Sequence, residues 1–396
     1  MKKFFTVATM FALVAGFTAC SSSDDGGSTP PAAPAEEYVN RATSNSGLTL
    51  AATHHFLEVS EEAKPTVIKF AVYNNGQDVT SDASVYVLEG NNSKKLVDAK
   101  FTPEATGVYQ FWASYGLENT KADALLNITA VSDVPTVLAD ENPTSSNFFH
   151  RALIIKATRV NCPNCPRATD GIHMFFDGSN YADNAVQMAL HTYDDGHVLS
   201  SKGAITLTRQ AGLGASYPAI KLNFDKLIPT GYSADIAKAL DKEIGAICSN
   251  ASETAIAVST SYNAETGAIS VAAKVKCDEP NKYKVSAVLL QDNVYFYQQG
   301  AYKAEHNMHD AIVRSVAPTT GVGFALNNGE ETITGKVYDF CCEFNASELY
   351  SKGTGEHALD IARDARVIVY VQTADKVVEN VVSCGLNQKV GFAYNN

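Results

Sequence analysis

The sequence predicts a multi-domain α+β protein, with a β-sandwich first, an α/β domain in the centre and an antiparallel β-sandwich at the end. Three observations support this fold class. Between about residues 48 and 131, apolar and polar residues alternate in short runs separated by turn residues. The apolar run 153–158 then leads into a Cys-x-x-Cys motif and a helical pattern. From residue 255 onward the pattern is typical of β-strands again.

Charge and length limit the classes of function. The chain has 396 residues, with 31 Lys and Arg against 43 Asp and Glu, and its formal net charge is −12. An acidic protein is repelled by the phosphate backbone, so we do not expect nucleic acid as a partner. The Gly212-Leu213-Gly214 stretch lacks the Lys-Ser/Thr ending of a phosphate loop, and we expect no cofactor.

Residues 1–19 are typical of a signal peptide. Lys2 and Lys3 supply the basic start, an apolar run follows, and small residues precede Cys20. This pattern predicts a lipoprotein signal that is cleaved before Cys20, with lipid such as palmitate attached to that cysteine. The alternative is a plain secretory peptide in which Cys20 has no special role. A membrane-spanning helix is disfavoured, because the run is shorter than the ~20 residues that a bilayer requires.

Residues 20–37 form a predicted flexible tether. Small polar residues, Gly and Pro dominate it, and they bury too little apolar area to order a chain. The serines and aspartates directly after Cys20 resemble the export signal that one Gram-negative phylum uses for surface lipoproteins. We therefore expect a lipid anchor in the bilayer of the outer membrane and a protein that faces the cell exterior.

The first folded domain is predicted over residues 38–132. Its short alternating runs are typical of a small antiparallel sandwich. The Gly-x-Tyr-x-Phe-x-Ala strand and the closing strand after it resemble bacterial immunoglobulin-like modules. No cysteine lies in this range, so packing alone must hold the sheets together. The predicted strands are 66–73, 83–88, 107–115 and 124–131.

A polar, proline-containing linker is predicted over residues 133–147, and a second domain over residues 148–250. The continuous apolar run 185–191 indicates a buried strand. Apolar residues at helical spacing predict a helix over residues 233–247.

The Cys-x-x-Cys motif follows the predicted strand 153–158. Cys162 and Cys165 stand just before a predicted helix over residues 166–177, whose first-turn proline needs no N–H. A helix N-terminus presents unpaired N–H groups and a positive dipole end to the first sulfur, which favours thiolate. A strand, a Cys pair and a helix in this order predict a thioredoxin-like domain.

Pro218 completes the predicted site. The Tyr217-Pro218 step leads into a strand, and in thioredoxin-like folds a proline at this point is cis and packs against the Cys pair. A proline in this position exposes an edge of the main chain, to which an extended peptide or protein ligand could form hydrogen bonds. The alternative is a trans proline that starts a strand. We expect only one strand between Pro218 and the helix 233–247, and hence an abbreviated fold.

The C-terminal domain is predicted over residues 251–396. Several of its runs alternate with period two and would bury one face, which indicates a second antiparallel sandwich with its own core. The predicted strands are 255–258, 268–275, 283–290, 332–338 and 366–371.

Several motifs together are similar to the Omp-twenty-eight-related family of outer membrane lipoproteins. The resemblance covers roughly residues 148–396 and implies a thioredoxin-like domain followed by a β domain, in a lipoprotein of poorly defined activity. The signal peptide and the immunoglobulin-like module are additions that some members have. The motifs are Cys-Pro-x-Cys-Pro-Arg at 162–167, Tyr217-Pro218, residues 289–294, Gln298-Gln299-Gly300, residues 306–314, and a closing hairpin at 367–386.

No metal site is predicted from the histidines. Adjacent strand residues point to opposite faces, so His54 and His55 should not share a metal. His306 and His309 lack a third ligand at a useful spacing, and packing or hydrogen bonding is the expected role of both.

Five further cysteines have no partner that the sequence identifies. An oxidising compartment favours disulfides, and we expect two of them with one buried thiol left over. Their pairing cannot be deduced, and zinc-type spacing is absent. They are Cys248, Cys277, Cys341, Cys342 and Cys384.

Two functions compete at this stage. In the first, the protein is a surface-anchored lipoprotein with a binding or structural role, and Cys162 and Cys165 form a permanent disulfide. In the second, the protein is a thiol-disulfide oxidoreductase in which Cys162 attacks and Cys165 resolves a mixed disulfide. Pro166 stands where redox members usually carry a residue with an N–H donor, and this favours the first function.

Overall fold

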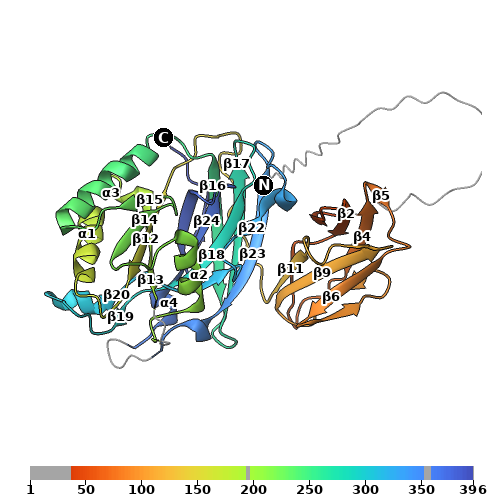
Figure 1. The fold of residues 1–396 in the computed structure, drawn as a ribbon, viewed down its shortest axis with the longest axis horizontal. Helices are drawn as coiled ribbons and strands as arrows, with labels where there is room; N and C mark the ends of the chain where they lie inside the picture. Colours follow the sequence, from red (N-terminus) through yellow and green to blue (C-terminus); the bar gives the residue numbers. More distant parts are fainter. Residues whose placement is uncertain (1–36, 193–196, 352–357, 396) are drawn as a thin grey trace, which may run out of the picture. The chain divides into compact units, whose positions relative to one another are not determined.

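The computed structural model describes residues 37–192, 197–351 and 358–395 (Figure 1). The predicted signal peptide, most of the tether and Cys20 lie outside these residues. Within the described ranges, no helix is both long enough and apolar enough to cross a membrane.

The N-terminal region is a sandwich of two sheets (Figure 1). Its strands are β1 (Asn40–Thr43), β2 (Leu48–Ala52), β3 (Phe56–Glu58), β4 (Ile68–Asn74), β5 (Gln77–Asp78), β6 (Ser84–Glu89), β7 (Asn92–Lys95), β8 (Lys100–Phe101), β9 (Gly107–Tyr115), β10 (Glu118–Asn119) and β11 (Leu126–Val131). One sheet has the order β1-β2-β4-β5 with β8 beside β4, and the other has the order β3-β11-β9-β6-β7 with β10 beside β9. Alternate side chains of the strands meet between the sheets, where the rings of Phe70 and Phe111 are 4.7 Å apart.

The central region contains a four-stranded part of a larger sheet with helices on both faces. Its elements are β12 (Ala152–Thr158), α1 (Cys165–Gly178), β13 (Ala185–His191), α2 (Lys202–Ala211), β14 (Ala219–Leu222), β15 (Lys226–Ile228) and α3 (Ser233–Ile247). The strand order is β15-β14-β12-β13, with β12 parallel to β13 and antiparallel to β14. One face packs on α1 and α3, and the other packs on α2.

The expectation of a single strand between Pro218 and α3 was wrong. The strand β15 pairs with β14 through a tight turn, in which Asn223 and Phe224 adopt positive φ angles of 51° and 60°. The sequence did not indicate it because β15 has only three residues and two of them are exposed. The helix α2 was not predicted either, although Ser201 caps its first turn and Gly212 ends it in the left-handed conformation.

Helices α1 and α3 approach each other closely at Gly171. A Cβ atom at this position would lie 2.7 Å from the Cβ of Ile236, so only glycine allows this contact. The close contact packs α1, the helix that begins at Cys165, against α3.

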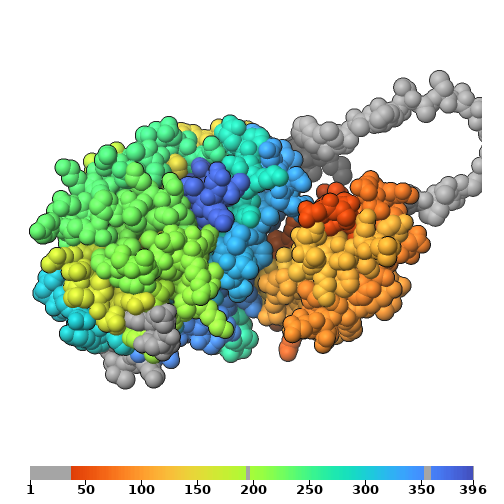
Figure 2. Space-filling model, viewed as in Figure 1, coloured from red at the N-terminus to blue at the C-terminus, as the bar shows by residue number. Residues whose placement is uncertain are grey.

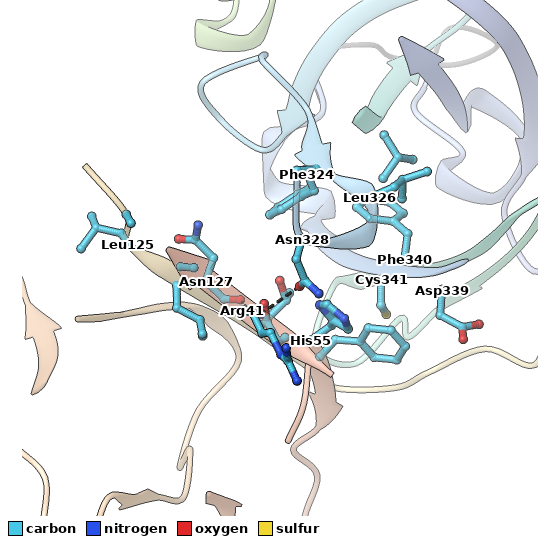
Figure 3. Close-up of a pocket in the computed structure, with 18 of the residues that line it drawn as sticks. Arg41, His55, Leu125, Asn127, Phe324, Leu326, Asn328, Asp339, Phe340 and Cys341 are labelled. Atoms are coloured by element: carbon cyan, nitrogen blue, oxygen red, sulfur yellow. Dashed lines mark hydrogen bonds between the residues drawn. The ribbon is translucent and has the colours of Figure 1, made fainter. Parts of the chain in front are cut away.

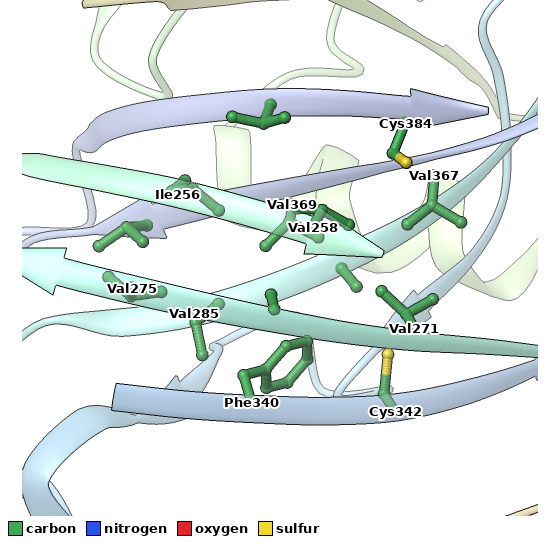
Figure 4. Close-up of a cluster of buried hydrophobic side chains, with 14 of the residues drawn as sticks. Ile256, Val258, Val271, Val275, Val285, Phe340, Cys342, Val367, Val369 and Cys384 are labelled. Carbon is green, nitrogen blue, oxygen red and sulfur yellow. The ribbon is translucent and has the colours of Figure 1, made fainter. Parts of the chain in front are cut away.

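The C-terminal region adds strands to the central sheet and covers them with a second sheet. Its strands are β16 (Thr254–Tyr262), β17 (Ala268–Cys277), β18 (Lys284–Gln291), β21 (Ile312–Ala317), β22 (Phe324–Ala325), β23 (Val337–Asn345), β24 (Ala365–Gln372), β25 (Val378–Gly385) and β26 (Lys389–Val390). The large sheet runs β15-β14-β12-β13-β21-β18-β24-β25, and the second sheet runs β23-β17-β16-β26. Valine, isoleucine and phenylalanine side chains fill the space between the two sheets (Figure 4).

The C-terminal region thus contains two packed sheets, and one of them continues into the central region. The junction is a parallel pairing of Ala189 in β13 with Ile312 in β21. The predicted domain boundaries stay predictions. The expected strand 332–338 was placed too early, because Gly335 forms a turn with a φ of 75° and the strand β23 begins at Val337.

Short elements complete the fold. They are β19 (Val294–Tyr295), β20 (Met308–His309), the helix α4 (Ile361–Asp364) and the 3-10 turns η1 (Ala182–Asn184), η2 (Ala304–Asn307), η3 (Leu326–Gly329) and η4 (Ala346–Glu348). Strands β19 and β20 form a separate two-stranded sheet next to α1, at the lower left of Figure 1.

Candidate functional site

The Cys pair lies between the end of β12 and the start of α1, as the sequence indicates. Cys162 and Cys165 form a disulfide with a Cα–Cα distance of 5.4 Å. Cys165 is the first residue of α1, and its N–H donates to the carbonyl of Cys162 at 3.2 Å. The exposed fraction is 7% for Cys162 and 1% for Cys165, so the disulfide is covered by other parts of the chain.

The Tyr217-Pro218 peptide bond is cis, the isomer that the sequence predicts. Pro218 precedes β14, whose residue Ala219 pairs with Ala157 near the end of β12. The guanidinium carbon of Arg159 lies 4.3 Å from the centre of the Tyr217 ring. The fold thus brings the Tyr217-Pro218 peptide next to the loop that carries the disulfide.

The main chain of Tyr217 has an open edge. Among the residues that the structure describes, neither its N–H nor its C=O has a hydrogen-bond partner, because pairing with β12 ends at Ala219. Its side chain is held in place, since the hydroxyl shares a 2.5 Å hydrogen bond with Thr192. Such an edge can pair with an extended peptide.

A buried amine lies beneath α1 and was not singled out from the sequence. Lys156 points from β12 toward α1, and its Nζ donates to the hydroxyl of Thr169 at 3.2 Å. Burial lowers the pKa of Lys156 to about 8, although the nearby Asp310 opposes the shift. Thr169 is one turn after Cys165, so this amine sits under the helix end that carries the disulfide.

A segment from the C-terminal region also contacts the disulfide loop. Residues 296–307, between β19 and β20, are called the strap below. The side chain of Gln298 donates to the carbonyl of Cys162 at 3.0 Å, and three strap side chains contact Asp170 on α1. No local pattern in the sequence connects the strap with α1, because more than 130 residues separate Gln298 from Cys162.

His306 and His309 form hydrogen bonds, which is a role that the sequence predicts for both. The Nε2 atom of His306 lies 2.8 Å from Asp170, and that of His309 lies 3.0 Å from the carbonyl of Phe296. The Nδ1 atom of His54 lies 2.8 Å from the hydroxyl of Thr53. In the described part of the chain, no group of three His, Cys, Asp or Glu side chains is arranged to hold a metal.

The expectation of two further disulfides was wrong. Cys248, Cys277, Cys341, Cys342 and Cys384 are all free thiols. Burial raises the pKa of Cys248 to about 11 and that of Cys277 to about 12, so neither forms thiolate readily. These thiols act as small apolar side chains.

A separate pocket of about 310 Å³ lies away from the disulfide (Figure 3). Arg41, His55 and Asn328 line it together with Asp339 and Cys341. The main-chain N–H of Arg41 donates to Asn328 at 2.9 Å, which is the dashed bond in the figure. None of the predicted site residues lines this pocket.

The Cys pair at the start of α1 and the cis-proline before β14 are the two features on which the prediction of a thioredoxin-like domain rests. Among solved structures, HBP35 of Porphyromonas gingivalis is similar to this chain, with a TM-score of 0.48 and 18% identity over 64% of this chain and 79% of HBP35. A β-glucosidase from Kluyveromyces marxianus aligns with a TM-score of 0.18 and 8% identity, over 87% of this chain and 45% of the enzyme. No protein-family model matches the chain, and no curated protein matches it.

Proposed function

We propose that this protein is a lipid-anchored outer membrane lipoprotein that binds an extended polypeptide at its thioredoxin-like region. The open main-chain edge of Tyr217 carries the proposal. It lies beside the Cys162–Cys165 disulfide and at the end of a sheet strand, where an added strand can form main-chain hydrogen bonds.

Aromatic side chains near this edge suit the side chains of such a peptide. Tyr232 precedes α3 and is highly exposed. The adjacent Ser233 donates to the carbonyl of Arg167 at 2.9 Å, which places Tyr232 next to the first turn of α1. Exposed tyrosines supply contact area at a low cost in conformational entropy, and they are enriched at binding surfaces. The proposed ligand is therefore an extended segment with apolar or aromatic side chains.

A peptide with main-chain modification tests this binding mode. We expect a peptide of about twelve residues with alternating Tyr and Val to bind the full chain and to slow hydrogen exchange at the Tyr217 amide. The matched control is the same peptide with alternate amides N-methylated, which removes the strand-forming N–H groups and should abolish binding. Equal binding of both peptides, or protection only in the N-terminal sandwich, would refute the proposed edge.

The lipid anchor has a test of its own. Labelled palmitate should enter the protein through Cys20, and Cys20→Ala should release the chain from membranes. Protease added to intact cells should then digest the anchored protein, because we propose that it faces the exterior. A membrane-bound Cys20→Ala variant would refute the anchor, and complete protection from protease would refute the orientation.

A second candidate function is thiol-disulfide exchange. The observation that favours it is the disulfide at the start of α1, with the Lys156 amine beneath that helix end. A substrate thiolate would attack the Cys162 sulfur and displace Cys165 as a thiolate. The second substrate thiol would then displace Cys162, which leaves an oxidised substrate and a reduced Cys pair.

A further inference from the structure

The strap crosses the loop that carries the disulfide and binds its main chain. The Nε2 atom of Gln298 is within 3.3 Å of the carbonyl oxygens of Arg159, Val160 and Cys162. The main-chain N–H of Gln299 also donates to Val160 at 2.7 Å. Gln298 is buried, so these bonds are shielded from water and the strap is held against the loop.

The contact between the strap and the loop leaves no free space. At Gly300, a Cβ atom would lie 2.4 Å from the carbonyl oxygen of Pro163, and the φ of this glycine is 76°. The strap therefore rests directly on the residue after Cys162. In Figure 2 the strap forms part of the cyan surface beside the yellow surface of α1.

Asp170 fixes the strap from the side of α1. Its side chain is 10% exposed, and the carboxylate accepts a hydrogen bond from the hydroxyl of Tyr302 and pairs with Lys303 at 3.3 Å. The Nε2 atom of the buried His306 lies 2.8 Å from the same carboxylate. Burial raises the pKa of Asp170, but the bonds from Tyr302, His306 and Lys303 outweigh it and leave the pKa below its ordinary value.

The other contacts of the strap lie mainly at its start, where Phe296 packs against Val160 and its carbonyl lies 3.0 Å from Nε2 of His309. The strap is framed by β19 and β20, which have two residues each, and several of its side chains are exposed. Tyr297 and Tyr302 are 69% and 57% exposed. Segments with few buried apolar contacts open locally without unfolding of the core. Between residues 298 and 306, the carboxylate of Asp170 and the amide of Gln298 are therefore contacts that oppose opening.

We infer that Asp170 is a positioning residue that holds the strap over Cys162, and that opening of the strap limits how fast a second thiol reaches the disulfide. This inference rests on the proposed function, since it describes regulated access to the same site. It assigns the attacking thiol to the open state, and the disulfide is protected in the closed state.

The rate of disulfide reduction in the full chain tests this inference. The measurement is the second-order rate constant for reduction of Cys162–Cys165 by dithiothreitol, with trapped thiols located by mass spectrometry. We expect Asp170→Asn to raise the rate by about tenfold, because it weakens three contacts of the strap. Asp177→Asn, on the exposed side of the same helix, should leave the rate unchanged within about twofold.

A pair of tyrosine variants keeps the test valid if Asp170→Asn does not fold. Tyr302→Phe removes only the hydroxyl that reaches Asp170, and Tyr297→Phe makes the same change on the same strap. We expect about a threefold faster reduction for Tyr302→Phe and no change for Tyr297→Phe. Equal rates for these two variants, with both folded, would refute the inference.

The equilibrium constant for reduction by glutathione separates positioning from a direct electrostatic effect. A strap that only limits access changes the forward and reverse rates together, so this constant should stay within about twofold in Asp170→Asn. A constant that changes as much as the rate would show that Asp170 acts on the sulfurs, and the inference would be wrong. Peptide binding is measured separately, so a chain that binds no peptide but reacts faster as Asp170→Asn refutes only the proposed function.

Discussion

The central region and the C-terminal sandwich share one continuous sheet, yet they bury different chemistry. In the central region, Lys156 and Asp170 are held by specific polar partners next to a disulfide. In the sandwich, Cys342 and Cys384 lie in an apolar core, and burial raises the pKa of both thiols. The comparison shows that a helix end and its polar neighbours, rather than the presence of cysteine, distinguish the candidate site.

The largest expected difference is in thiol reactivity. With iodoacetamide at pH 8, the buried Cys277 and Cys342 should react at least about 100-fold more slowly in the native protein than in urea, because burial disfavours the thiolate. Peptide mapping over the described residues should find five modified cysteines in urea alone and two more after reduction, from the pair Cys162 and Cys165. Fewer than five without reductant would mean that some of these five cysteines form a disulfide.

The next prediction concerns the shared sheet. Leu289 in the sandwich and Ile155 in the central region are fully buried, and either change to Ala should lower the free energy of unfolding by about 3 kcal/mol. Because the sheet is continuous, both variants should shift the same urea transition. Leu227→Ala, on the exposed part of β15, should change it by less than about 0.5 kcal/mol. Two separate transitions, each moved by one variant, would contradict a single cooperative sheet.

A smaller effect is expected from the buried amine. The folded-state pKa of Lys156 is about 8, below its ordinary value, so the unfolded chain binds more protons between about pH 8 and pH 10.4. Below pH 8 the amine is charged in both the folded and the unfolded state, so burial of this charge lowers the free energy of unfolding of the wild-type protein by its full amount. Lys156→Met should therefore be more stable at pH 7 by about 1 kcal/mol, after allowance for partial exposure and the lost bond to Thr169.

The pH dependence supplies the check on that prediction. The difference between the two proteins should shrink as pH rises from 8 to 10.4, because the wild-type amine loses its charge in both states. Unfolding in urea at several pH values measures this difference. The thiols and tyrosines titrate equally in both proteins, so they do not contribute to it. A difference that does not change with pH would mean that Lys156 is charged without cost.

Local patterns predicted the parts of the site that are near each other in sequence. The strand before Cys162 and the helix after it follow from short runs of residues, whereas the cis bond at Pro218 was expected only because thioredoxin-like folds have a cis-proline near the Cys pair. The strand β15 was missed because three residues carry too little pattern. Asp170 was missed because its partners, Tyr302 and His306, come from more than 130 residues further along the chain.

Long-range placement also explains the error on the free cysteines. Cys341 and Cys342 are adjacent in β23, and adjacent strand residues face opposite sides of the sheet. Cys342 enters the core of the sandwich, while Cys341 packs with Val131 and Ala272 on the other side. The number of cysteines does not indicate which face of a strand each one occupies. The oxidation state of these five cysteines therefore could not be inferred from their number and an oxidising compartment.

We propose that Cys162–Cys165 is a protected structural disulfide beside a peptide-binding edge, and its reduction potential tests this proposal most directly. Burial of Cys165 and the missing N–H of Pro166 both disfavour thiolate and stabilise the oxidised form, whereas the Lys156 amine acts in the opposite direction. Equilibration of the full chain with dithiothreitol buffers, followed by thiol trapping, should give a potential below about −300 mV. A potential above about −270 mV would contradict the claim and make thiol-disulfide exchange the better function.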